Sequence, residues 1–470
     1  MRITAPTFGR RVNGPTGPSQ AVGHTMPTPK APPPELPIEP APPVAARPLD
    51  SFVADLRALC LAKLDPSAIA NSPPDVLVPE VELLISEIAN ERRIQLNARE
   101  QRQLATDLVD DMLGLGPLEP LLEDESVNDI MVNGPNITFV ERRGKVYPAN
   151  IRFRDTAHLI NVCQRIAAAV GRRVDESSPM VDARLKDGSR VNIVLPPLAL
   201  DGPYVSIRKF SKKAIDFNKL VEFGAMTKPV ARVLEICAQI RLNVIISGGT
   251  GSGKTTMLNA MSRLIDNGER IVTVEDAAEL QLQQPHVVRL ETRPANLEGR
   301  GEINQRDLVR NALRMRPDRI IIGEVRGSEA FDMLQAMNTG HDGSMSTIHA
   351  NNTRDAITRV ENMVQMGSMG LPLGAIRTQI VSAVDIILQV ERQRDGGRRL
   401  TQVTEVVGME GDMVLLNDIF RYQIDSEGSD GRLRGHYETV RARPSFQSRI
   451  SYFGLDRAWT DAIESAEADR

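Results

Sequence analysis

The sequence predicts an α/β fold in which smaller helical and α+β units precede a domain built on a mostly parallel sheet. The 470 residues suit two or three domains, at roughly 100–200 residues per domain. Apolar residues make up 41% and charged residues 25%, as in soluble globular proteins with a sizeable core. From about residue 220 onward, short β-branched runs alternate with helical patterns, which is typical of a parallel sheet covered by helices.

Composition argues against several classes of protein. The net charge is 57 − 61 = −4, without the basic excess usual in nucleic-acid-binding proteins, and 4% aromatic residues leave few stacking platforms. Three scattered cysteines (Cys60, Cys163 and Cys237) cannot form a disulfide framework or a four-thiolate zinc site. No apolar run approaches the roughly 20 residues of a membrane span, and the N-terminus lacks the core of a signal peptide. We therefore expect a cytosolic protein with reduced cysteines.

The N-terminal part divides into a tail and a bundle. Thirteen of the 31 prolines fall in the first 48 residues, which predicts a disordered tail, either a docking peptide or a plain extension. Three amphipathic patterns follow, around residues 52–60, 81–88 and 105–112, and predict a small helical bundle. Gly114-Leu115-Gly116-Pro117 is a strong helix stop.

Next come an α+β unit and an α/β unit. Four β-branched runs (Ile130–Val132, Ile137–Val140, Val191–Leu195 and Tyr204–Ile207) flank one expected helix, His158–Val170. Lys209–Phe217 is polar and suits a hinge, and Asp385–Phe420 predicts antiparallel strands around a Gly396-Gly397 turn. The expected divisions are a tail (1–47), a helical bundle (48–118), an α+β domain (119–212), a linker (213–225), an α/β domain (226–442) and a C-terminal tail with a loose helix (443–470).

The strongest motif matches G-x-x-x-x-G-K-[ST] in full, between an expected strand (Asn243–Ser247) and an expected helix (Thr256–Ile265). Its glycines let backbone amides turn toward phosphates, and the helix N-terminus adds partial positive charge. Lys254 would reach the β- and γ-phosphates, and the Thr255 hydroxyl would bind Mg²⁺. The predicted ATP-binding residues are Gly248, Gly249, Thr250, Gly251, Ser252, Gly253, Lys254, Thr255 and Thr256.

Carboxylates end two further β runs. Ile271–Val274 leads into Glu275-Asp276-Ala277-Ala278-Glu279, where one carboxylate could orient or deprotonate the attacking water; the alternative is a polar loop with an N-cap at Asp276. Ile320–Ile322 leads into Gly323-Glu324, which suits a Mg²⁺-binding Walker B element, although buried strands ending in glutamate are common. Gly323 stands where an aspartate often sits, so Glu324 would carry the role alone.

Histidine and arginine side chains complete the candidate site. His349 lies in a polar stretch, residues 339–352, and could hydrogen-bond a γ-phosphate or its water, although a lone histidine is more often structural. Arg190 follows a turn of the α+β unit, and Arg208 ends one of its strands. Arg306, Arg310 and Arg314 share a helical face. Guanidinium groups stabilise the charge that develops in phosphoryl transfer, but a solvated basic face or a surface for acidic headgroups is the simpler interpretation for any one of them.

These motifs, in this order, resemble the secretion ATPases of type IV pili and of type II and type IV secretion. The CpaF branch, the motors of tight-adherence (Tad/Flp) pili, is similar over about residues 50–440. The similar phrases are Arg314-Met315-Arg316-Pro317-Asp318-Arg319, Gly323-Glu324-Val325-Arg326-Gly327, Asn338-Thr339-Gly340-His341, Leu115-Gly116-Pro117-Leu118 and Asp129-Ile130-Met131-Val132-Asn133-Gly134. Many pilus assembly ATPases carry a four-cysteine zinc module, which three scattered cysteines exclude here.

The resemblance implies a hexamer whose RecA-like ATPase domain follows a PAS-like domain, with ATP between the two. It makes Gly248–Thr255 the Walker A motif and Glu324 the Walker B residue. It places His349 in a "His box" and Glu275–Glu279 in an acidic "Asp box" that supplies the catalytic glutamate, for which we prefer Glu275 over Glu279. It further implies that Arg190 and Arg208 approach the γ-phosphate.

The resulting hypothesis is a hexameric, Mg²⁺-dependent ATP hydrolase that drives assembly, and conceivably retraction, of Tad/Flp pili. It would be cytoplasmic, peripheral to the inner membrane, and in contact with the membrane only through the pilus platform proteins, with no direct nucleic-acid partner. Three alternatives stay open: a type IV secretion ATPase with a protein substrate, a nucleic-acid translocase on the same core, and a scaffold that binds ATP and barely hydrolyses it.

Overall fold

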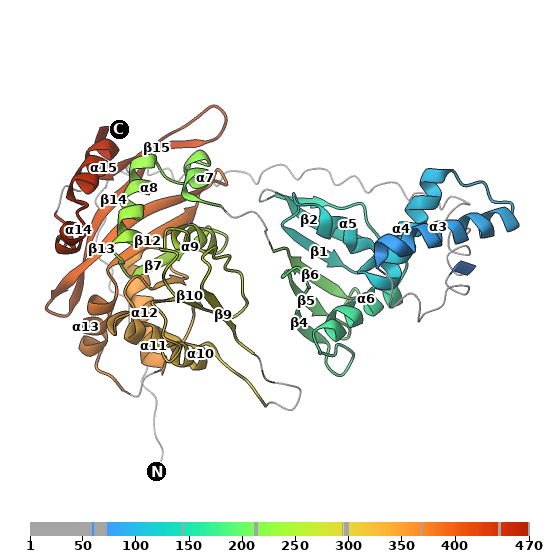
Figure 1. Cartoon of the computed structure of the whole chain (residues 1–470), viewed down its shortest axis with the longest axis horizontal. Helices are drawn as coiled ribbons and strands as arrows, with labels where there is room; N and C mark the ends of the chain where they lie inside the picture. Colours follow the sequence, from blue (N-terminus) through green and yellow to red (C-terminus); the bar gives the residue numbers. More distant parts are fainter. Residues whose placement is uncertain are drawn as a thin grey trace, which may run out of the picture.

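The computed structural model describes residues 59–60, 73–142, 145–210, 215–293, 295, 300–367, 370–439 and 443–468. The expected tail (1–47), most of the first expected helix (52–60) and the centre of the expected hinge lie outside these residues. The described part forms two lobes, each built on its own sheet (Figure 1). We call residues 116–210 the middle lobe and residues 215–468 the P-loop lobe.

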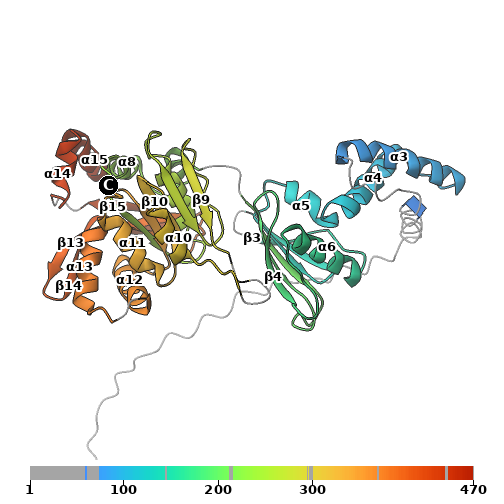
Figure 2. The same cartoon turned by 60° about the horizontal axis from the view of Figure 1, so that its bottom comes forward.

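Two helices precede the middle lobe: α3 (Pro74–Glu91) and α4 (Ala98–Leu113). The Asn97 side chain accepts from the backbone N–H of Glu100, and the Glu100 side chain accepts from that of Asn97, so α4 begins with a complete capping box. It ends at Leu113, with Gly114 as its C-cap, as the helix stop predicts. Apolar side chains of both helices form a small core of their own. Both figures place this pair at the end of the middle lobe that lies away from the P-loop lobe (Figures 1 and 2).

The middle lobe is an antiparallel sheet with the order β3-β2-β1-β6-β5-β4 among the described strands. The four predicted strands and the helix are confirmed, whereas β3 and β4 were not predicted, because β3 is exposed throughout and neither strand has a clear apolar alternation. A single core joins α6 to one face of the sheet. The elements are η1 (Gly116–Leu118), α5 (Glu119–Glu123), β1 (Asp129–Asn133), β2 (Ile137–Arg142), β3 (Lys145–Pro148), α6 (Thr156–Ala169), β4 (Met180–Arg184), β5 (Arg190–Val194) and β6 (Tyr204–Arg208).

The P-loop lobe contains a mixed sheet with the order β15-β14-β13-β12-β7-β11-β10-β8-β9. From β12 to β9 all neighbours are parallel, and β12 to β15 form an antiparallel extension, as the 385–420 pattern predicts. The strands are β7 (Val244–Gly248), β8 (Ile271–Glu275), β9 (Val287–Glu291), β10 (Arg319–Val325), β11 (Met345–Ile348), β12 (Ile386–Arg392), β13 (Arg398–Glu410), β14 (Met413–Glu427) and β15 (Leu433–Thr439).

Helices cover both faces of this sheet, which explains why its central strands are almost entirely buried and mostly apolar. One core contains α7 (Phe217–Glu222), α8 (Lys228–Gln239), α9 (Lys254–Ser262), α14 (Gln447–Tyr452) and α15 (Asp456–Ala468). The other contains α10 (Gln305–Ala312), α11 (Glu329–Asn338), α12 (Thr353–Gly367) and α13 (Leu373–Ala383). The two sets appear on opposite sides of the sheet in Figures 1 and 2.

The C-terminal segment differs from the expected tail. Helix α15 packs against α8, and Trp459, Ala462 and Ala466 are buried in the same core as the central strands. The Trp459 ring meets Phe446 edge to face, with ring centroids 5.6 Å apart. Sequence reasoning missed this because only one side of α15 is apolar and the rest of the segment is polar. Among the described residues, no helix combines the length and apolar character needed to cross a bilayer.

Candidate functional site

Four neighbouring parallel strands deliver the four sequence motifs to one edge of the sheet. The order β7-β11-β10-β8 places the loop after β7 beside His349, which follows β11. Glu324 lies at the end of β10, and the segment Glu275–Glu279 begins at the end of β8. Because the carboxyl ends of parallel strands meet at the same edge, motifs separated by up to a hundred residues converge there.

The P-loop joins β7 to α9. Gly251 (φ 68°) and Gly253 (φ 100°) adopt the left-handed conformation that favours glycine, and this turns the loop around its own backbone amides. The Ser252 hydroxyl donates to the carbonyl of Gly249 at 2.9 Å and braces the turn. Thr255 and Thr256 are half-buried in the first turn of α9. Helix α9 (Lys254–Ser262) begins two residues earlier than the sequence indicates.

Lys254 lies folded over the loop. Its ammonium group donates to the carbonyls of Gly248 (3.0 Å) and Gly249 (2.9 Å). Burial lowers the pKa of Lys254, and the nearby Glu324 carboxylate opposes that shift. A cation held here by two weak acceptors can move to a better acceptor, such as a phosphate oxygen, at little cost.

Glu324 is paired with an arginine that sequence reasoning did not single out. Arg326 donates to Glu324 Oε2 through Nη2 (2.5 Å) and Nε (3.0 Å), and its Nη1 lies 3.6 Å from Asp276 Oδ2. The hydrogen bond to Glu324 raises the pKa of Arg326. Burial raises the pKa of Asp276, with Arg326 opposing the shift. Arg326 thus links the end of β10 to the acidic segment after β8.

Glu275 is buried, with 2% of its surface exposed, and its carboxylate faces its own loop. Oε2 accepts from the backbone N–H groups of Glu279 (2.6 Å) and Leu280 (2.8 Å). The Thr273 hydroxyl donates to Oε1 at 3.3 Å. Burial raises the pKa of Glu275. This carboxylate therefore shapes the loop that carries Asp276 and Glu279.

The packing of Glu275 explains why β10 has Gly323 at the position where an aspartate often precedes the Walker B glutamate. A Cβ atom at this position would lie 3.1 Å from Cγ of Glu275, closer than most real contacts allow. The buried Glu275 side chain fills the space that a side chain on residue 323 would need. The Gly323 carbonyl is also engaged, because it accepts from the Thr347 hydroxyl at 2.7 Å.

His349 follows β11 directly and is half-buried between the P-loop strand and β10. Its ring makes no hydrogen bond with the part of the chain that the structure describes. Both ring nitrogens are therefore available to a ligand. Thr347, two residues earlier, ties this segment to β10 through Gly323.

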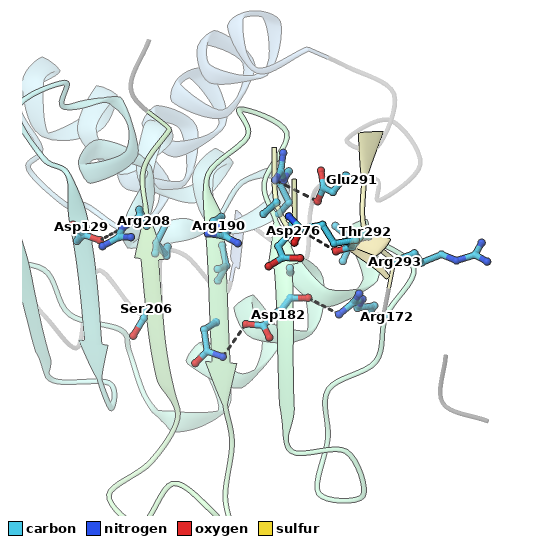
Figure 3. A pocket seen from close by; sticks show the side chains of 18 of the residues that line it. Asp129, Arg172, Asp182, Arg190, Ser206, Arg208, Asp276, Glu291, Thr292 and Arg293 are labelled. Atoms are coloured by element: carbon cyan, nitrogen blue, oxygen red, sulfur yellow. Dashed lines mark hydrogen bonds and ion pairs between the residues drawn. The ribbon is translucent and has the colours of Figure 1, made fainter. Parts of the chain in front are cut away.

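A cleft of about 1020 Å³ separates the two lobes, lined by the middle-lobe sheet on one side and by residues 276–277, 291–293 and 302–305 on the other. Figure 3 shows Arg190 and Arg208 on neighbouring strands, with Asp276 and Thr292 across the cleft. Arg190 Nη1 lies 2.6 Å from Glu279 Oε1, so this arginine already contacts the other lobe. Arg208 remains within its own lobe, with Nε 3.2 Å from Asp129 Oδ1. The P-loop does not line this cleft.

Comparison with known proteins now decides the family. The model of the type II/IV secretion system protein family matches residues 111–413. The chain belongs to this family. A putative conjugal transfer protein of Mycobacterium tuberculosis is 42% identical over 316 residues, which is 66% of this chain and 88% of that protein. The type IV secretion system protein VirB11 of Brucella suis is 30% identical over 318 residues, 62% of this chain and 88% of the relative. The solved VirB11 ATPase of Brucella suis, in complex with sulphate, is 29% identical, covers 62% of this chain and 95% of its own, and has a TM-score of 0.33.

In this secretion-system protein the matched region contains every predicted site residue. A further middle-lobe arginine was missed: Arg184 lies 3.3 Å from Glu291 and donates to the carbonyl of Ala278 at 3.2 Å. No local pattern marks Arg184, because its partners lie about a hundred residues away. Arg306 and Arg310 instead bind Asp332 of α11, a structural role. The cysteines lie in three separate cores, and no cluster of three or more metal-ligating His, Cys, Asp or Glu occurs among the described residues.

Proposed function

We propose that the chain is a motor ATPase that hydrolyses ATP to ADP and phosphate. The observation that carries this proposal is the convergence of the P-loop, Glu324, His349 and the acidic segment at one sheet edge. A P-loop alone supports nucleotide binding. The carboxylates beside it add groups that can position or deprotonate a water molecule, which favours hydrolysis over a scaffold that only binds ATP.

The residues present fit a magnesium ion brought in with the nucleotide. The Thr255 hydroxyl and the Glu324 carboxylate are hard oxygen donors beside Lys254, as Mg²⁺ prefers, and the described residues offer no carboxylate cage that would hold a metal without phosphates. Thr255 and Glu324 would hold the ion. Its chemistry would be to neutralise charge on the phosphates during transfer.

Glu279 is the better candidate for the general base. Oε2 of Glu275 is occupied by two loop amides, whereas Glu279 has a partly exposed carboxylate held by one flexible arginine, Arg190. Release of Arg190 toward a γ-phosphate would free Glu279 to accept a proton from water. We therefore propose Glu275 as a positioning residue, Glu279 as the base, and Arg190 as the group that stabilises phosphate charge, with Arg208 and His349 as further candidates.

The machine that we propose is a Tad/Flp pilus motor. It would be a cytoplasmic homohexamer, with the P-loop lobe as a RecA-like domain and the middle lobe as a PAS-like domain, acting on inner-membrane platform proteins. The α3–α4 pair, the β12–β15 extension and the separate placement of the cysteines support this branch over one with a zinc module.

A type IV secretion motor is the second candidate, and the relatives' names favour it. They include the putative conjugal transfer protein of Mycobacterium tuberculosis and VirB11 of Brucella suis. The two candidates share the proposed chemistry and differ in the structure that receives the work.

Steady-state phosphate release by the wild type and by Glu324→Gln, with oligomeric mass measured in the presence of ATP, tests the activity. We expect the wild type to turn over and the variant to bind ATP as a hexamer while turnover falls on the order of a hundredfold or more. Equal inactivity of both proteins, with platform proteins added, would support the scaffold. Strong stimulation by DNA would support a translocase. Loss of pili, rather than of protein or DNA transfer, in a deletion strain would separate the two motors.

A further inference from the structure

An arginine from the antiparallel extension covers the P-loop. Arg398 opens β13, 147 residues after Gly251, and its Nε donates to the Gly251 carbonyl at 2.9 Å. The same side chain passes over the next glycine, since a Cβ atom on Gly253 would lie 3.5 Å from Arg398 Cδ. The Arg398 side chain is exposed, and its two terminal nitrogens make no hydrogen bond or ion pair within the described residues.

Neighbouring arginines in the same hairpin have other partners. The Arg399 guanidinium lies 5.1 Å from the Tyr422 ring centroid and donates to the Leu433 carbonyl, a structural role inside the extension. Arg394 pairs with Glu427 at 2.7 Å on the exposed surface. Arg398 is therefore the member of this arginine-rich hairpin that is directed at the P-loop, and Arg394 is a matched surface residue that is not.

Sheet order decides which part of a nucleotide Arg398 would meet. The P-loop strand β7 has β11 and β10 on one side, which carry His349 and Glu324, and β12 and β13 on the other. Under the proposed function, on which this inference rests, the γ-phosphate lies on the Glu324 side. The sugar and base must then leave the P-loop toward the opposite side, where Arg398 lies.

We infer that Arg398 binds the ribose–base end of the nucleotide. A guanidinium group is planar and stacks on aromatic faces, and its free N–H groups can donate to ribose or base acceptors. The hydrogen bond from Arg398 to the Gly251 carbonyl fixes the orientation of the guanidinium plane beside the P-loop before any ligand binds. Binding therefore needs little ordering of a long, flexible side chain.

This placement predicts a distinctive pattern of binding. The base and ribose do not change during hydrolysis, so a contact to them stabilises ATP, ADP and the transition state equally. Loss of the contact should raise the Kd values for ATP and ADP by the same factor, on the order of tenfold, and leave kcat unchanged. Inorganic tripolyphosphate has no ribose or base, and its affinity should not change.

The test is calorimetric titration of ADP, of a non-hydrolysable ATP analogue and of tripolyphosphate into the full chain, with kcat and KM from phosphate release. The proteins are the wild type, Arg398→Ala, Arg398→Lys and the matched control Arg394→Ala, with Lys254→Ala as a P-loop control. We expect Arg398→Ala to weaken both nucleotides equally, Arg398→Lys to recover part of the affinity, and Arg394→Ala to match the wild type.

Several outcomes would overturn the inference. Arg398→Ala binding that equals Arg394→Ala, a loss of tripolyphosphate affinity as large as that of ADP, or a fall in kcat at unchanged Kd would each place Arg398 outside the ribose–base site. If Arg398→Ala fails to fold, Arg398→Gln takes its place in the same comparison. A wild type that binds no nucleotide would instead refute the proposed function, and Lys254→Ala separates that result from a failure of the Arg398 inference alone.

Discussion

Replacement of Glu275 by alanine should destabilise the P-loop lobe far more than replacement by glutamine. One carboxylate oxygen of Glu275 accepts from two backbone N–H groups, at 2.6 and 2.8 Å, and the residue is 2% exposed. Alanine leaves both N–H groups without this acceptor. At about 1–3 kcal/mol for each unsatisfied donor, the cost is about 2–6 kcal/mol. Glutamine keeps a carbonyl oxygen at the same place and should cost much less.

Thermal unfolding measures the difference. For a lobe of this size, 1 kcal/mol lowers Tm by roughly 2–4 °C, so Glu275→Ala should melt about 4–24 °C below Glu275→Gln at neutral pH. Circular dichroism of the full chain records the transition. Equal Tm values for the two variants would refute the argument that Glu275 holds its loop through backbone amides.

The pH dependence of the same pair gives an independent check. Burial raises the pKa of Glu275 in the folded state above its value in the unfolded chain. The contribution of this carboxyl to stability is therefore full at low pH and declines as pH rises through the folded pKa. Glu275→Gln has no such titration. We expect its free energy of unfolding to gain on the wild type as pH increases from about 4 toward neutral, and the opposite trend would contradict the assigned burial effect.

Three further replacements test other parts of the structure. Trp459→Ala should lower the free energy of unfolding by about 3–5 kcal/mol in denaturant titrations, because α15 packs in the main core; a change near zero would restore the expected C-terminal tail. Arg319→Ala should cost about 1–3 kcal/mol in the same measurement, because Glu269 Oε1 loses its buried donor, whereas Arg241 still binds Oε2 at 2.8 Å. Arg184→Ala should change stability by at most about 1 kcal/mol, since the ion pair with Glu291 is partly exposed. It should still increase hydrogen exchange of the Ala278 N–H, because that N–H donates to Glu291, which Arg184 holds; unchanged exchange there would contradict the docking role.

The sequence predicted the parts of the fold that have strong local signals. The central strands β7, β8 and β10 each contain a run of buried β-branched residues, and the glycine-rich loop indicates the end of β7 and, to within two residues, the start of α9. In contrast, β3 has four exposed residues and no periodicity, so nothing in the local sequence separates it from a loop. Helix α15 was underestimated for a related reason: its buried residues are few, and their partners lie on α8, more than two hundred residues earlier.

The candidate site followed the same division. Residues next to strand ends could be predicted, because a parallel sheet gathers those ends at one edge. The role of each carboxylate could not be predicted, because it depends on where the side chain points. Glu275 points into its own loop, and Glu279 points toward the middle lobe. Arg184 and Arg398 were missed because their partners are set by tertiary contacts rather than by spacing along the chain. Arg326 lies in the Gly323–Gly327 motif, but its contact with Asp276 could not be predicted, because that contact joins two separate strand ends.

The acidic segment after β8 is where these contacts meet. Glu275 fixes the backbone of the loop from inside, and Arg184 donates to the Ala278 carbonyl from the middle lobe. Arg190 binds Glu279 from the same lobe, one strand away. Because two of the interlobe contacts fall on residues 278 and 279, a displacement of the middle lobe acts directly on the loop that carries the proposed base, as well as on Glu291 of β9. A ligand that attracts Arg190 would release the Glu279 carboxylate from its ion pair, while Arg184 still holds the loop through the Ala278 carbonyl. The two lobes could therefore remain docked while Glu279 becomes available to accept a proton.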